Sequence, residues 1–208
     1  MLLESQKENG VAVVEMGAAT TSVAIFMEGF LQYFGVINVG ANHITNDIAI
    51  SLAVSTEVAE EIKMKYVTAE LIDNDKPMTM RFGDESISFT KTMVNRIVED
   101  RLIDIFEHVK KEIAIAGYEK KLPEGVVLTG GGAEMRGIER FAREHMEVAT
   151  RIGLPLMDVT HIDNETKKPR FAVAIGLALM MNDDMREQET RVEEKPAGFL
   201  SKLFGGGR

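Results

Sequence analysis

Two short runs of β-branched and apolar residues constrain the fold more than any other feature of this chain. The first is VAVVE at 11–15, and the second is GVVLT at 125–129. Each run is followed almost at once by small residues, GAATT in the first case and three glycines in the second. Runs of this length with turn-forming residues behind them are typical of buried strands. They predict that the chain mixes buried strands with the helices described next.

The residues between the two runs predict a meander and then helices. Residues 21–26 and 30–36 have strand character and are joined by a turn at Glu28-Gly29, so with 11–15 they predict three antiparallel strands. Further on we expect a helix capped by Thr45 and ending at Leu52, a helix capped by Thr56, a hairpin over 78–89 and an amphipathic helix over 91–116.

The pattern after Pro123 restarts with the second strand run. It predicts a helix near 136–146, a short apolar stretch around Ile152 and a last apolar helix over about 170–182. Residues 183–197 are charged, contain a proline and have no apolar stripe, so they are expected to be a flexible linker.

Charge and composition exclude several classes of function. The net charge of −9 argues against a nucleic-acid partner, because phosphate backbones are bound by clustered cations. The chain has no Cys, which rules out disulfides and thiolate metal sites, and its four His residues have no ligand spacing. We find no signal peptide and no apolar run of about 18 residues, so a cytoplasmic protein with at most peripheral membrane contact is expected.

Three motifs could carry chemistry. Glu15 to Thr21 places a glycine and two hydroxyls between strands, where backbone amides can approach a phosphate, although a tight hairpin of small residues is an equally simple explanation. Gly130, Gly131 and Gly132 could let a flat ring or sugar lie against the backbone, or could simply form a strand-to-helix turn. Glu60 and Lys63 are neighbours on a helix and could be an ordinary surface ion pair.

The C-terminal tail, 198–208, contains four large apolar residues that would share one face of a helix. They are Phe199, Leu200, Leu203 and Phe204, with Lys202 beside them. This arrangement is typical of a short amphipathic membrane anchor, which binds firmly only when several copies act together. A disordered end that happens to contain aromatic residues is the alternative.

The order of these motifs resembles the second large domain of the actin-like ATPase superfamily and is most similar to the bacterial cell-division FtsA family. The matching strings are GVAVVEMGAATTSVAIF, GANHITNDIAISL with AEEIKMKY, VVLTGGGAEMRGI, RIGLP and PRFAVAIGLAL, which cover about residues 10–182. The resemblance implies an α/β, ribonuclease H-like large subdomain, 11–45 and 123–182, with a small α+β subdomain, 46–122, inserted into it.

The resemblance also implies roles for single residues. Gly17, Thr20 and Thr21 would contact the phosphates of ATP, Glu60 and Lys63 its ribose and adenine side, and Gly130 to Gly132 its adenosine. The small subdomain would bind the C-terminal peptide of FtsZ through Arg101 and Asp104, which resemble a family Arg-x-x-Glu pair. Solvated helix charges are the alternative for that pair. The tail would attach the protein to the inner face of the cell membrane at the septum, and self-association is a further expectation.

Two departures from the family pattern limit the expected activity. The family usually has Asp at the position of Glu15, whose longer side chain would shift a carboxylate that holds Mg²⁺ through water. The first domain of the family is absent from this sequence, and 1–10 resembles the end of the helix joining the two domains, so we expect a truncated form and at most a weak ATPase. The alternatives are an ATPase completed by a separately encoded first domain and another actin-like module such as the pilus-assembly protein PilM.

Overall fold

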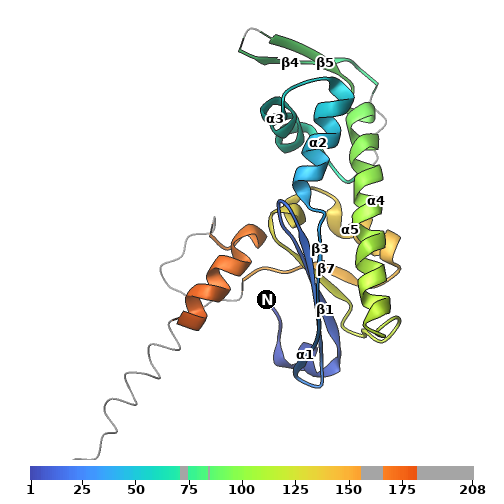
Figure 1. Ribbon diagram of the computed structural model, residues 1–208, viewed down its shortest axis with the longest axis vertical. Coiled ribbons are helices and arrows are strands. Elements are labelled where there is room, and N and C mark those ends of the chain that lie inside the picture. The colour runs from blue at the N-terminus through green and yellow to red at the C-terminus, as the bar shows by residue number, and fades with distance from the viewer. Residues whose placement is uncertain (71–74, 84, 156–165, 182–208) are drawn as a thin grey trace, which may run out of the picture. The chain divides into compact units, whose positions relative to one another are not determined.

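The computed structural model describes residues 1–70, 75–83, 85–155 and 166–181 (Figure 1). It consists of two compact units, Met1–Ala172 and Val173–Arg208. The first unit contains β1 to β7 and α1 to α5, of which α1 (Glu4–Asn9) precedes the first strand. The described part of the second unit belongs to a helix over 172–181. The predicted linker, 183–197, and the predicted tail, 198–208, lie outside the described residues.

A five-stranded mixed sheet in the order β3-β2-β1-β6-β7 forms one half of the first unit. The strands are β1 (Val11–Met16), β2 (Thr21–Met27), β3 (Phe30–Ile37), β6 (Val126–Thr129) and β7 (Thr150–Ile152). The first three strands pair antiparallel, which confirms the predicted meander, while β6 and β7 run parallel to β1. The two β-branched runs therefore lie side by side at the centre of the sheet, where both are buried.

Helices cover one face of this sheet. Residues Thr21, Val23 and Ile25 of β2 are buried, whereas the residues between them are only partly buried, so one face of the strand belongs to the core. Helix α4 (Lys91–Ile115) contacts β2, β3 and α5 (Ile138–Met146) on that side. Its apolar row fits the predicted amphipathic stripe.

A smaller group of elements lies at the other end of α4 (Figure 1). It comprises α2 (Ala41–Leu52), α3 (Thr56–Tyr66) and the hairpin of β4 (Met78–Phe82) and β5 (Glu85–Phe89). Helix α2 packs on both α3 and α4. Because α4 contacts both this group and the large sheet, the two groups share a continuous apolar core.

The predicted start of α2 was wrong. Thr45 does not cap the helix, which instead begins at Ala41 after Gly40, and the hydroxyl of Thr45 bonds inside the helix to the carbonyl of Ala41. A Cβ on Gly40 would lie 2.7 to 2.8 Å from backbone atoms of the β1–β2 turn, so close packing selects glycine there. The next helix is capped by Ser55, one residue before the predicted Thr56.

The remaining elements follow β6 and β7. They are the short 3-10 helix η1 (Gly131–Glu134), α5, the 3-10 helix η2 (Pro169–Phe171) and the helix over 172–181. Within the described part of the chain, no helix has both the length and the apolar character needed to cross a bilayer.

Candidate functional site

The carboxyl ends of the two central parallel strands meet at a crevice. Glu15 of β1 pairs with Thr129 of β6, so the turn after β1 and the glycines after β6 leave the sheet side by side. Such edges are the usual ligand positions of open α/β sheets, because the strands present loop backbone rather than side chains there. The structure thus brings together the first two predicted motifs.

The turn after β1 is held against the start of α2. The amide of Gly17 donates to the carbonyl of Thr20, and the amides of Ala41 and Asn42 donate to the carbonyls of Gly17 and Ala18. Thr20 is partly exposed in this turn, whereas Thr21 is fully buried and its hydroxyl donates to the carbonyl of Val39 at 2.8 Å. Thr21 therefore supports the turn from inside and offers no surface to a ligand.

Packing against β1 explains two of the three consecutive glycines but not the third. Gly130 has a φ of 83°, and a Cβ there would lie 2.6 Å from the carbonyl oxygen of Met16; a Cβ on Gly132 would lie 2.7 Å from the Met16 Cβ. Close packing on β1 explains both glycines without a ligand. A Cβ on Gly131 would meet nothing within 4 Å. Gly131 is consequently the member of the three that presents open backbone.

Glu15 lies between the two loops. Positions for a Cβ on Gly17 and on Gly130 fall 3.4 Å and 2.6 Å from its carboxylate oxygens. Burial raises the pKa of Glu15 above the ordinary value of 4.5. A nearby cation would offset that cost, but among the described residues no cluster of three His, Asp or Glu side chains could bind a metal. A single carboxylate of this kind fits a cation held through water.

Glu60 and Lys63 form more than a surface ion pair. Lys63 Nζ lies 2.7 Å from Glu60 Oε2, and both groups bond to the hydroxyl of Thr45 on α2, at 2.8 and 2.6 Å. The Lys63 side chain is 10% exposed and also donates to the carbonyl of Ala41. Burial alone would raise the pKa of Glu60, but the bonds from Lys63 and Thr45 and the charge of Lys63 hold it below its ordinary value.

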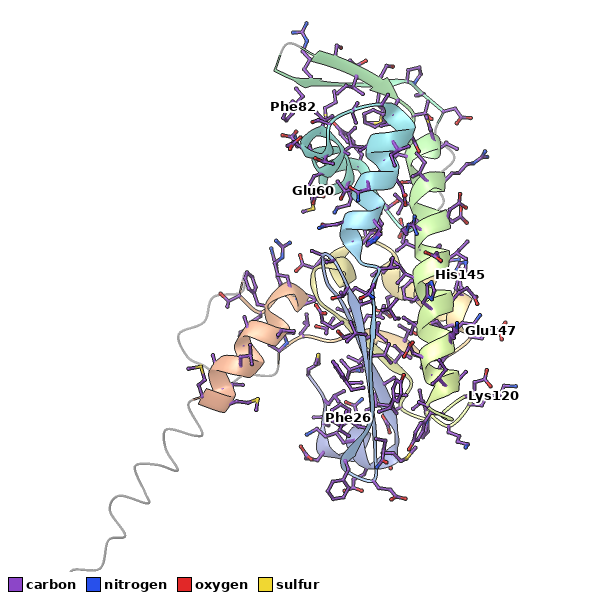
Figure 2. All side chains as sticks on the ribbon, viewed as in Figure 1. Phe26, Glu60, Phe82, Lys120, His145 and Glu147 are labelled. Carbon is purple, nitrogen blue, oxygen red and sulfur yellow. The ribbon has the colours of Figure 1, made fainter. Side chains whose placement is uncertain are left out.

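The network joins α3 to the helix that carries the β1–β2 turn. Figure 2 shows Glu60 beside α2 and α3. Sequence reasoning identified the pair but missed Thr45 as its third member, because Thr45 was interpreted as a helix cap.

A cavity of about 650 Å³ connects all three motifs. Its lining residues are Gly17, Ala18, Ala41, Asn42, Glu60, Lys63, Met64, Lys65, Tyr66, Val67, Thr68, Lys91, Gly131, Gly132, Glu134, Met135, Arg136 and Arg170. Met64 and Met135, two apolar side chains in this lining, were not selected by the sequence motifs. Methionine side chains are flexible and polarisable, which suits them to contact with a flat ring.

The far side of the cavity is fixed by an ion pair. Arg170 of η2 donates from its backbone amide and its guanidinium to Glu134 of η1, and this bonding is the main reason that the pKa of Glu134 is lowered. The amide of Gly130 donates to the carbonyl of Pro169, which ties η2 to the glycine loop. The segment PRF at 169–171 therefore belongs to the cavity wall.

A second set of predicted residues lies on α4. The guanidinium of Arg101 bonds to both carboxylate oxygens of Asp47, at 2.7 and 3.0 Å, and to Asp104 at 2.7 Å. The bond to Asp47 is the main reason that the pKa of Arg101 is raised. Bidentate hydrogen bonds between a guanidinium and a carboxylate are strong and directional.

A hollow of about 370 Å³ lies beside Arg101. It is lined by Asp47, Ile50, Ser51, Ile97, Asp100 and Arg101. Ile50, one of these lining residues, is 80% exposed. Sequence reasoning selected Arg101 and Asp104 but missed the α2 side, because only the tertiary fold brings α2 next to α4.

Comparison with solved structures shows the class of fold. The structure is similar to that of MreB5 of Spiroplasma citri bound to ADP, with a TM-score of 0.69 at 17% identity over 88% of this chain and 56% of that one. It is also similar to the PilM-PilN type IV pilus biogenesis complex, with a TM-score of 0.65 at 20% identity over 85% of this chain and 47% of that one. Fold and crevice together define an actin-like domain.

Sequence comparison is more specific. The profile of the family described as "Cell division protein FtsA" matches residues 12–176. The FtsA of Pseudomonas aeruginosa is 33% identical over 86% of this chain and 44% of the relative, and that of Borreliella burgdorferi is 33% identical over 98% and 51%. The chain belongs to the FtsA family, which confirms the resemblance, and it spans about half the length of these relatives.

Proposed function

We propose that this chain binds ATP in the cavity at the carboxyl ends of β1 and β6. The observation that carries the proposal is the convergence of the β1–β2 turn, the start of α2, the Glu60–Lys63 pair and Gly131 on that one cavity. Backbone around Gly17 faces the phosphate end, and Lys63 with Met64 and Met135 faces the nucleoside end. A similar solved structure is described as bound to ADP, which supports a nucleotide as the ligand.

Magnesium would accompany the phosphates. Glu15 lies between the β1–β2 turn and the glycine loop, and its carboxylate would hold the ion through water. Hydrolysis is expected to be slow, because Glu15 stands where the family usually has Asp and its longer side chain would shift the carboxylate that holds the ion. Nucleotide would then act as a regulator of assembly.

The binding test uses a fluorescent ATP analogue titrated into the chain. Replacing Lys63 with Met removes the cation that bonds Glu60 and Thr45, and we expect affinity to fall at least about tenfold. Lys110→Met is the matched control, since Lys110 also pairs with a glutamate three residues away on its helix, at 2.6 Å, and lies outside the lining of the cavity. Equal affinities for both variants would contradict the assignment of the cavity.

We also propose that the chain connects FtsZ filaments to the cytoplasmic membrane at the septum. Membership in a cell-division family supports this role, and the hollow beside Arg101 offers an apolar residue and a charged pair to a peptide. The apolar tail residues Phe199, Leu200, Leu203 and Phe204 supply the membrane contact in this proposal. The family match favours this role over a PilM-like one, since the actin-like fold is common to both.

Co-sedimentation with anionic liposomes tests the membrane contact. We expect Leu203→Asp to abolish sedimentation of the chain, whereas Ser201→Asp, which adds the same charge on the other side of the helix proposed from the sequence, keeps most of it. Liposomes that display an FtsZ C-terminal peptide should recruit both variants through the Arg101 hollow. Recruitment of neither the parent nor the variants under either condition would exclude the connecting role for this chain.

A further inference from the structure

The cavity proposed for ATP collects positive charge in a chain that is acidic as a whole. Among the described residues that line it, five carry cationic side chains and two carry carboxylates, although the chain has a net charge of −9. Two of the cations form ion pairs with the two lining carboxylates. The remaining three have no carboxylate in the lining to offset them, and they are Lys65, Lys91 and Arg136.

These three cations belong to the nucleoside end of the cavity. Lys65 directly follows Met64 in the chain, and Arg136 directly follows Met135. All four side chains line the cavity, so these two cations lie beside the methionines that are proposed to face the base. The nucleoside end of ATP carries no charge, because its negative charges are all on the phosphate chain. ATP therefore leaves the three cations without an anionic partner.

Lys91 reaches the same end of the cavity through the segment that follows α3. The amide of Thr68 in that segment donates to the side-chain oxygen of Asn95, one helical turn after Lys91 on α4, at 3.4 Å. The amide of the next residue, Ala69, donates to the carbonyl of Arg136 at 2.8 Å. Lys91 and Arg136 thus flank one short stretch of backbone, although they are far apart in the sequence.

All three cations are available to a ligand. Lys91 forms no ion pair with any described residue. The Arg136 side chain is 75% exposed, and its ion pair with Glu70 is 3.5 Å long. Lys65 pairs with Glu61, but both side chains are exposed. Exposed pairs of this kind contribute little, whereas a phosphate forms strong charge-assisted hydrogen bonds with ammonium and guanidinium groups.

We propose that the cavity preferentially binds a nucleotide that carries a second phosphate group on its ribose, and that Lys65, Lys91 and Arg136 bind this group. The inference rests on the proposed nucleotide site and specifies its ligand more closely. The 5′ phosphates would lie at the β1–β2 turn, and the ribose phosphate would face the three cations. A cavity of about 650 Å³ lies within the range that holds ligands of this size.

Displacement of a fluorescent ATP analogue from the full chain tests the inference. Adenosine 5′-phosphate, adenosine 3′,5′-bisphosphate and adenosine 2′,5′-bisphosphate differ only in the ribose phosphate. We expect one of the bisphosphates to displace the analogue at a concentration about tenfold lower than the monophosphate does. The better of the two identifies the ribose position that carries the phosphate. Added salt should reduce the advantage, since it screens exposed charges.

Variants of the cations test which residues bind the second phosphate. Lys91→Met and, separately, Arg136→Met should each reduce the advantage of the bisphosphate to about threefold or less. Lys91→Arg keeps the charge and should restore the advantage, which separates loss of the cation from loss of the fold. Lys110→Met and Arg140→Met are the matched controls, because each residue pairs with a glutamate on its own helix and lies outside the cavity lining.

Three outcomes would overturn the inference and leave the proposed nucleotide site in place. Equal displacement by the monophosphate and both bisphosphates would show that no second phosphate is bound. An advantage that persists in both methionine variants would place that phosphate away from these cations. Equal losses for monophosphate and bisphosphate would show that the cations contact the face of the base instead. An analogue that does not bind the parent chain would contradict the proposed function, and the inference with it.

Discussion

At the scale of single residues, the three consecutive glycines show that identical neighbours can be required for unrelated reasons. Gly130 and Gly132 allow the loop to lie on Met16, whereas Gly131 meets no neighbour and faces the cavity. A sequence with GGG indicates that backbone must come close to something. It cannot indicate that β1, rather than a ligand, is what two of these glycines touch.

Alanine substitutions should separate these roles. We expect Gly131→Ala to change the free energy of unfolding by less than about 0.5 kcal/mol, because its Cβ would enter open space. Gly132→Ala should cost about 1 to 3 kcal/mol, since its Cβ would overlap Met16. Urea denaturation of both variants checks the difference, and equal losses would show that the loop does not pack on β1 as described.

Glu15 leads to a prediction about pH. Its pKa is raised by burial, so the folded protein binds the proton more tightly than the unfolded chain, and stability falls as pH rises from the ordinary value of 4.5 through the folded value. Glu15→Gln lacks this cost. Its melting temperature should exceed that of the parent at pH 7.5, and the difference should disappear towards pH 4. A difference that grows on acidification would contradict the assigned direction.

At the scale of elements, strand positions were predictable and one helix start was not. Alternating or continuous β-branched runs such as VAVVE and TSVAIF leave a strong signal, and β1 and β2 begin where those runs begin. The start of α2 depends on Gly40, which caps the helix without a side chain and is selected by the distant β1–β2 turn. Thr45 supplied a stronger but misleading local signal.

The candidate site was also only partly predictable from the sequence. Its backbone loops and the Glu60–Lys63 pair follow from short motifs, whereas Arg170, Met64 and Asp47 reach their sites only through contacts between distant elements. Thr21 looks like Thr20 in the sequence, but strand alternation turns its side chain into the core.

The contact between α2 and α4 should depend on the planar guanidinium group of Arg101. Arg101→Lys keeps the charge but cannot bond both oxygens of Asp47 and Asp104 together. We expect affinity for an FtsZ C-terminal peptide, measured by fluorescence anisotropy, to fall about tenfold. Arg96→Lys, the same change at an exposed position of α4, is the control. Unchanged binding in the Arg101 variant would move the peptide site elsewhere.

At the scale of the whole first unit, α4 makes the large sheet and the smaller group depend on each other. Leu102, fully buried near the middle of the helix, lies in the apolar core that both groups share. Leu102→Ala should lower the free energy of unfolding by about 2 to 5 kcal/mol. Circular dichroism and hydrogen exchange of the hairpin and of the sheet should show one common transition at a lower temperature. Loss of protection in only one group would show that the two unfold separately.

Helix α2 has a further consequence for the first unit. Thr45 bonds to the Glu60–Lys63 pair at the cavity, and Asp47, two residues later, bonds to Arg101 at the hollow. If a nucleotide bound in the cavity favours one position of α2, it would also change the position of Asp47 and so the proposed peptide site beside Arg101. Thermodynamic reciprocity then requires the peptide to change the affinity for nucleotide by the same factor. If the proposed function holds, Thr45 and Asp47 of one helix would couple filament attachment to nucleotide binding.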